Sequence, residues 1–327
     1  MVLDIREGEC VALLEDGARS GLALLDALAG KTSFAPGRLY VDGQDVTNMP
    51  PAQRPITCVD DPLTIPAWRS AYGYMLGALG PEPADRRERR EAANQLLQAV
   101  EWHRATHAPL VRVTAEEQRL LRLACALASG ERVLLLTHPL PDGKLTWLCQ
   151  VGIAVVMLVD SLAAAGAAHR VAVMHAGGID CVASPRNLAH APLSAYAARR
   201  AGRVNMLRVR VAARGPANRL AWDLDGLTIP AQAEMALPLL DTLAWLCVDP
   251  ADIRVSRRME GAFHLSAVAE GQQEGGMGLR LPGGQRIVAQ AASGECPRPG
   301  ERVCVRWDIA AARVLWDSID DEEMISC

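Results

Sequence analysis

The stretch Val11–Gly30, VALLEDGARSGLALLDALAG, decides the fold. An apolar run, Val11–Leu14, leads into a small polar turn at Glu15–Gly21, and a helical apolar pattern then continues to Gly30. A strand, a tight glycine-containing loop and a helix in this order are typical of a phosphate-binding loop in a parallel sheet. The stretch therefore predicts a strand–turn–helix unit within an α/β domain.

The turn lacks the side chains that phosphate chemistry needs. The motif G-x-x-x-x-G-K-[ST] supplies a lysine for the β- and γ-phosphates and a hydroxyl for Mg²⁺. Aligned with this chain, those two positions hold Gly21 and Leu22. We therefore interpret the turn as a vestigial loop that folds but holds no nucleotide, with a phosphate cradle as the alternative. The aligned residues are Glu15, Asp16, Gly17, Ala18, Arg19, Ser20, Gly21 and Leu22.

Length and composition exclude several classes of protein. At 327 residues, the chain is long enough for two domains. It has no run of 18 apolar residues to span a membrane, and Met1–Cys10 has no apolar segment of the kind found in secretory signals. A net charge of −4 with mixed signs argues against a nucleic-acid-binding surface. The nine cysteines are scattered without a C-x-x-C pair, which favours reduced thiols over disulfides or a zinc site.

Strands and helices are predicted to alternate over the first 200 residues, as in a mostly parallel sheet covered by helices. Thr114 and Glu117 form a capping-box pattern before one of the helices. The predicted strands are Asp4–Leu14, Gly37–Gly43, Ile56–Val59, Val133–Leu136, Ala154–Val159 and Val171–Met174. The predicted helices are Leu22–Leu28, Ala71–Leu79, Asp85–Glu101 and Ala115–Ser129.

Beyond about residue 200 the pattern changes to short strand-like runs separated by glycine and proline. Such runs predict a small antiparallel barrel or sandwich. One apolar stretch, Leu237–Leu246, is predicted as a helix, and the domain boundary is expected within Ala191–Arg203. The expected strands are Asn205–Val211, Arg219–Leu224, Phe263–Ala267, Gly278–Leu281, Arg286–Ala289, Val303–Trp307 and Arg313–Trp316.

Several further segments occur in an order and spacing that resemble a known family. They are Gly8-Glu9-Cys10-Val11, Gly37–Thr47, Met49–Arg54, Arg170–Leu188, Gly202–Asn205 and Val248–Ile253. Together with the loop, they resemble the ATP-binding subunits of ATP-binding-cassette (ABC) solute importers of the polyamine, iron and sugar type. The resemblance implies a P-loop NTPase-like nucleotide-binding domain over 1–200, with its N-terminal hairpin truncated. It also implies a small all-β TOBE-like barrel over 203–327.

The functional motifs of that family are replaced in this chain. Its signature motif L-S-G-G-Q aligns with Val113, Thr114, Ala115, Glu116 and Glu117. The Mg²⁺-linked Asp and the water-activating Glu of the Walker B motif are replaced by Thr137 and His138, and the switch His by Asp160. The Gln that senses Mg²⁺ falls at Asp60 or Asp61.

These replacements remove a cation and add carboxylates. At an effective dielectric of about 20, a carboxylate roughly 4 Å from a phosphate charge costs about 4 kcal/mol. The sequence therefore predicts a degenerate cassette subunit with no catalytic residue, no metal and no bound cofactor. The resemblance implies that it couples or regulates a partner cassette (an intact one or a second copy) and permease subunits. It implies a cytoplasmic location, with membrane contact only through the permease and no nucleic-acid partner.

Two other functions stay open. The chain could be an active or ATP-binding transport ATPase with an unorthodox site that uses ATP and Mg²⁺, with Arg19 or Lys31 in place of the missing lysine. Alternatively, the TOBE-like domain could bind a small oxyanion or another regulatory ligand.

Five residues with reactive or metal-binding side chains are interpreted as having no role in chemistry. We expect His138 to be solvated, because it has no second metal ligand nearby. His103 and His107, four apart on an expected helix, are interpreted as exposed polar residues. Cys125 and Cys149 are interpreted as inert core thiols.

Overall fold

The computed structural model describes residues 3–15, 17, 19–33, 37–61, 66, 68–80, 85–111, 113–202, 205–214, 219–224, 227–232, 242–258, 264–273, 276–290 and 297–315. The chain forms two compact units, residues 1–185 and 186–327. The division falls earlier than the expected boundary because α6 (Pro185–His190) and α7 (Ala195–Arg200) group with the second unit. Alanines of α7 pack in one apolar cluster with Cys247 and Leu315.

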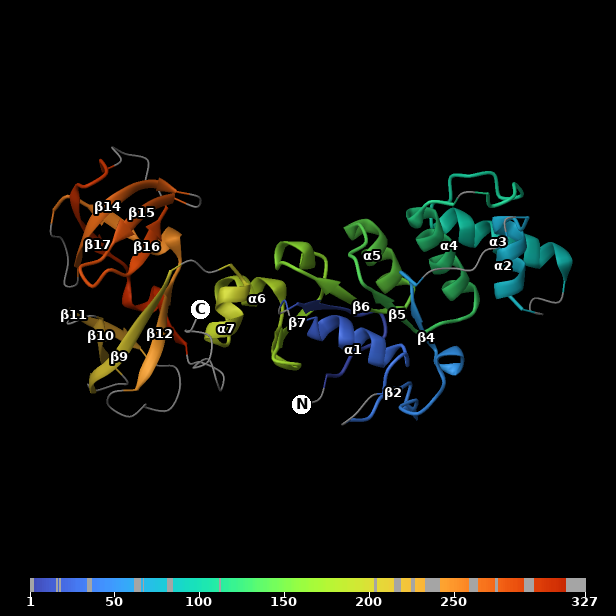
Figure 1. The fold of residues 1–327 in the computed structure, drawn as a ribbon, viewed down its shortest axis with the longest axis horizontal. Coiled ribbons are helices and arrows are strands. Elements are labelled where there is room, and N and C mark those ends of the chain that lie inside the picture. The colour runs from blue at the N-terminus through green and yellow to red at the C-terminus, as the bar shows by residue number, and fades with distance from the viewer. Residues whose placement is uncertain are drawn as a thin grey trace. The chain divides into compact units, whose positions relative to one another are not determined.

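The first unit is built on a six-stranded sheet in the order β4-β5-β6-β1-β7-β8 (Figure 1). The first five of these strands run parallel, and β8 is antiparallel to β7. The strands are β1 (Cys10–Leu14), β4 (Ile56–Cys58), β5 (Val133–Leu136), β6 (Ala154–Val159), β7 (Arg170–His175) and β8 (Gly178–Ala183). A separate two-stranded hairpin comprises β2 (Tyr40–Val41) and β3 (Gln44–Asp45), so the predicted strand over Gly37–Gly43 shortens to two residues.

Strand β1 forms the centre of this sheet. All five of its side chains are fully buried, as expected for a continuous apolar run with sheet neighbours on both sides. It pairs with β6 through Leu14 and Val159, and with β7 through Leu14 and Val173. Because β1, β4, β5 and β6 are parallel, the loops that follow them lie along one edge of the sheet.

Five helices cover or extend the sheet of the first unit. They are α1 (Ser20–Leu28), α2 (Ala71–Ala78), α3 (Arg86–Ala99), α4 (Ala115–Ala128) and α5 (Asp142–Gln150). Helix α1 buries Leu25, and the buried Arg54 donates to the carbonyls of Ala27 and Leu28 at its C-terminal end at 2.8 and 2.7 Å. Helices α2, α3 and α4 pack on one another. The predicted capping box before α4 is confirmed.

The prediction that His103 and His107 share a helix is wrong. Helix α3 ends at Ala99, and Glu101 has a φ of +60°, which leaves the right-handed helical region. Both histidines are exposed in the non-helical segment that follows. The ring of His107 lies against that of Tyr72, with the centroids 4.6 Å apart.

The second unit contains two five-stranded antiparallel sheets, in the orders β11-β10-β9-β12-β18 and β13-β17-β14-β15-β16 (Figure 1). The strands of the first are β9 (Met206–Arg214), β10 (Arg219–Leu224), β11 (Leu227–Gln232), β12 (Leu243–Val248) and β18 (Ala312–Leu315). Those of the second are β13 (Arg254–Ser256), β14 (Leu265–Gln273), β15 (Gly276–Arg280), β16 (Arg286–Ala289) and β17 (Arg302–Arg306). Buried side chains from both sheets share one core, and Leu246, Leu279 and Val305 are fully buried within it.

The predicted helix over Leu237–Leu246 is wrong where the structure describes it. Residues 233–241 lie outside the described residues, and Leu243–Val248 form strand β12, which lies between β9 and the edge strand β18. A continuous apolar run does not distinguish a strand buried on both faces from a buried helix. No helix in the described part of the chain is long and apolar enough to span a bilayer.

Candidate functional site

The vestigial phosphate loop contains an internal carboxylate. Glu15 follows β1, and its backbone N–H donates to Val159 O at 2.9 Å, which extends the pairing with β6. The backbone N–H of Gly21, in the first turn of α1, donates to Glu15 Oε1 at 3.1 Å. Unpaired N–H groups at a helix N-terminus are the usual donors to a bound phosphate. Here a carboxylate of the chain itself accepts from one of them.

Gly21, which stands where the family has lysine, is closely packed. A Cβ built there would lie 2.4 Å from Leu158 Cδ1 and 2.9 Å from Glu15 Oε2. Contacts under 3.0 Å force neighbouring atoms to move. A side chain at position 21 therefore requires both Leu158 and Glu15 to move.

Two described residues of the loop, Gly17 and Arg19, are open to solvent. Their φ values are +83° and +60°. Ser20 and Leu22 are half-buried at the start of α1, whereas Asp16 and Ala18 lie outside the described residues. Lys31, the second candidate replacement for the missing cation, forms ion pairs with Asp61 at 2.5 Å and Asp26 at 3.3 Å.

At the end of β5, Thr137 and His138 are held by Asp60, which follows β4. Asp60 Oδ2 accepts from the Thr137 backbone N–H at 2.6 Å, from its hydroxyl at 2.9 Å, and from the His138 N–H at 3.3 Å. The Thr137 hydroxyl also lies 3.0 Å from His138 Nδ1. The exposed His138 side chain fits the expectation of a solvated histidine.

The other carboxylate oxygen of Asp60 pairs with an arginine from α4. Arg119 Nε lies 2.5 Å from Asp60 Oδ1, and the guanidinium also donates to the His138 and Pro139 carbonyls. No sequence pattern singles out Arg119, because a single arginine on a polar helix face is usually solvated. Its only sequence signal is its position two residues after Glu117, within the aligned signature region.

The signature-equivalent residues form a helix cap. Thr114 Oγ1 accepts from the Glu117 N–H at 3.2 Å, and Glu117 Oε2 accepts from the Thr114 N–H at 2.8 Å. These hydrogen bonds and Arg104, 3.3 Å from the same carboxylate oxygen, lower the pKa of Glu117. Ala115 and Glu116 are exposed and Val113 is half-exposed.

The structure brings together part of the predicted set. Glu15, Asp60, Thr137 and Asp160 follow parallel strands and so lie along one sheet edge, with Asp160 exposed. Arg119 connects this edge to α4, whose N-terminus carries the signature-equivalent residues. Among the residues that the structure describes, no three His, Cys, Asp or Glu side chains are grouped to hold a metal ion.

These features define a class of protein. The first unit has the fold of an ABC nucleotide-binding domain, with a mainly parallel sheet, and an antiparallel β region follows it. Residues 276–315 match the TOBE domain family.

Particular relatives are similar along almost the whole chain. The spermidine/putrescine import ATP-binding protein PotA of Roseobacter denitrificans is 26% identical, covering 96% of this chain and 92% of its own. The Fe(3+) ions import ATP-binding protein FbpC of Streptomyces avermitilis is also 26% identical, and the match again covers 96% of this chain and 92% of the relative. A chain of the ATP-binding cassette MJ0796, in a dimeric post-hydrolysis structure with ADP and Pi, aligns at 18% identity and a TM-score of 0.47. That alignment covers 56% of this chain and 88% of the other.

Proposed function

We propose that this chain is an ABC-importer cassette subunit, of the polyamine or iron type, that does not itself hydrolyse ATP. Its role is to couple or regulate a partner cassette and the permease subunits. The similarity to PotA and FbpC proteins supports the importer class. The observation that carries the loss of turnover is the hydrogen bond from the Gly21 N–H to the Glu15 carboxylate.

This hydrogen bond matters because phosphoryl transfer depends on positioning and on stabilising negative charge. A carboxylate that accepts from the α1 N-terminus competes with phosphate for the same donor and repels it. At an effective dielectric of about 20 and a separation of about 4 Å, that repulsion is about 4 kcal/mol. The packing around Gly21 supports the same conclusion, because no cationic side chain fits there without rearrangement.

Among the described residues at the neighbouring sheet edge, the side chains that could replace the lysine or a Mg²⁺ ligand are already paired. The Thr137 hydroxyl is hydrogen-bonded to Asp60, and Asp60 is paired with Arg119. Lys31 is paired with two aspartates. The residues here do not suit a bound Mg·ATP, and we assign no catalytic step to them.

The second candidate is an ATP-binding subunit with an unorthodox site. The names of the relatives favour it, since both PotA and FbpC are ATP-binding proteins. In that case, nucleotide binding would have to displace the Glu15 carboxylate from the Gly21 N–H.

Binding of a fluorescent ATP analogue distinguishes the two candidates. The proposed subunit gives no signal that excess ATP competes away, and Glu15→Gln raises the affinity because it removes the repelling charge. Glu88→Gln is the matched control, since Glu88 is exposed on α3 and outside the loop. Micromolar binding by the unmodified chain, competed by ATP, would favour the second candidate.

A further inference from the structure

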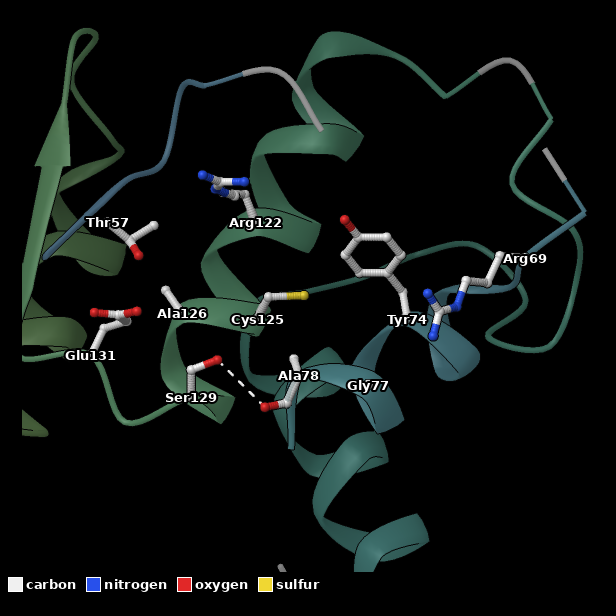
Figure 2. A pocket seen from close by; sticks show the side chains of 10 residues that line it. All are labelled: Thr57, Arg69, Tyr74, Gly77, Ala78, Arg122, Cys125, Ala126, Ser129 and Glu131. Atoms are coloured by element: carbon white, nitrogen blue, oxygen red, sulfur yellow. Dashed lines mark hydrogen bonds between the residues drawn. The ribbon is translucent and has the colours of Figure 1, made fainter. Parts of the chain in front are cut away.

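A polar cavity of about 400 Å³ lies between α2 and α4, and none of the loop residues 15–22 lines it. Figure 2 shows Arg69 beside Tyr74 on one side, with Thr57 and Glu131 on the opposite side. This volume is in the range of small-ligand sites, about 300–1,000 Å³.

Arg69 is held in place at the cavity wall. Its Cζ lies 5.4 Å from the centroid of the Tyr74 ring, a cation–π distance. A Cβ at Gly77 would lie 3.0 Å from Arg69 Nη2, so the glycine leaves room for the guanidinium. In the described part of the chain, Arg69 forms no ion pair with a carboxylate.

Arg122 provides a second guanidinium on α4. Its Nε is buried and has no hydrogen-bond acceptor among the described residues. A buried charged N–H without an acceptor is costly, so the geometry calls for an acceptor from outside the chain.

The opposite side of the cavity carries a carboxyl and two hydroxyls. Glu131 Oε2 is buried without a hydrogen-bond partner among the described residues; burial raises the pKa of this carboxyl, whereas a hydrogen bond with Thr57 and the charge of Arg122 lower it. Thr57 and Ser129 contribute hydroxyls to the lining, and Ser129 Oγ donates to Ala78 O at 3.4 Å. The cavity therefore carries the guanidiniums of Arg69 and Arg122 and, facing them, the carboxyl of Glu131 and the hydroxyl of Thr57.

We propose that this cavity binds a small organic oxyanion that also carries hydroxyl groups, such as a sugar phosphate or a hydroxy acid. The guanidiniums of Arg69 and Arg122 hold the anionic group, since arginine pairs well with phosphate and carboxylate. Glu131 and Thr57 receive the hydroxyls. The site does not depend on whether the phosphate loop takes a nucleotide.

Isothermal titration calorimetry of the full chain tests the proposal, with glucose 6-phosphate and malate as probes and glucose and inorganic phosphate for comparison. We expect at least one of the hydroxylated anions to bind more tightly than glucose or phosphate. Arg122→Gln and Arg69→Gln should each weaken that binding by about tenfold or more, because each removes a charged hydrogen bond. Arg86→Gln is the matched control, since Arg86 is exposed on α3 and outside the cavity.

A conservative variant covers the case in which Arg122→Gln fails to fold. Arg122→Lys keeps the charge but loses the planar fork, and we expect an affinity between those of the unmodified chain and Arg69→Gln. The proposal is overturned if neither hydroxylated anion binds. It is also overturned if Arg69→Gln and Arg122→Lys bind as tightly as the unmodified chain.

Discussion

Arg119 Nε lies 2.5 Å from Asp60 Oδ1, and this ion pair connects α4 to the residue that follows β4. The two side chains are 21% and 12% exposed, so solvent screens the pair less than a surface one. The other oxygen of Asp60 accepts from the backbone and hydroxyl of Thr137. One carboxylate thus joins α4, β4 and β5 at the edge where the family would bind nucleotide.

Replacing Asp60 tests whether this cluster stabilises the first unit. Asp60→Asn should lower the free energy of unfolding by about 1–3 kcal/mol, because Arg119 and Thr137 each lose a charged partner. Urea unfolding followed by tryptophan fluorescence measures the change. Asp308→Asn is the control, since Asp308 is 82% exposed and 3.9 Å from its partner Arg254. Equal unfolding midpoints for the two variants would contradict a structural role for Asp60.

Restoring the family lysine should not restore the site. Gly21→Lys places a Cβ 2.4 Å from Leu158 Cδ1 and 2.9 Å from Glu15 Oε2, so both side chains must move; because both contacts are with side-chain ends, we expect little change in unfolding free energy and no gain in ATP binding. Gly143→Ala in α5 is the matched glycine control. No atom lies within 4 Å of a Cβ there, so this variant should be neutral or more stable by about 0.5–1 kcal/mol. A stable Gly21→Lys variant that binds ATP would show that the loop rearranges readily.

The ion pair between Glu9 and Arg170 should make stability depend on pH. Arg170 lies 2.5 Å from Glu9, and its hydrogen bond lowers the pKa of this carboxyl below its usual value. The stabilisation is present above the unfolded-state pKa, about 4.3, and is lost as the pH falls through the lowered folded-state pKa. The urea midpoint of unfolding is measured for the unmodified chain and for Glu9→Gln at a series of acidic pH values. The difference between the two midpoints should shrink as the pH is lowered. A gap that does not change with pH would contradict this origin.

Two thiols should react slowly in the folded chain: Cys10 is buried, and Cys125 is half-buried at the wall of the polar cavity. Burial raises the pKa of Cys10 and of Cys125 to about 12, so little reactive thiolate exists at neutral pH. Iodoacetamide labelling mapped by mass spectrometry should modify both only after unfolding in urea. Rapid labelling of Cys125 in the folded chain would contradict its interpretation as an inert core thiol.

Local patterns predicted much of the first unit, because its signals lie within a few residues of one another. The apolar run Val11–Leu14 and the Thr114–Glu117 capping box each correspond to what the structure contains. Strand β12 was mistaken for a helix because both of its faces are largely apolar, which removes the alternation that marks a strand.

The sequence predicts which residues lie at the site better than it predicts which of their atoms contact one another. The family resemblance placed Glu15, Thr137 and either Asp60 or Asp61 at the site, and parallel strands bring these positions to one edge. The pairing of Asp60 with Arg119 joins residues 59 positions apart, and no local pattern specifies it. The hydrogen bond from the Gly21 N–H to Glu15 depends on a side-chain conformation that loop composition does not fix.

The most direct test of the central proposal is the Mg²⁺-dependent ATP hydrolysis rate of the purified chain beside that of a Thr137→Ala, His138→Ala double variant. The proposal predicts that both rates equal the buffer background, because the Glu15 carboxylate accepts from the α1 N-terminus and Asp60 holds Thr137. Turnover by the unmodified chain that the double variant abolishes would contradict it.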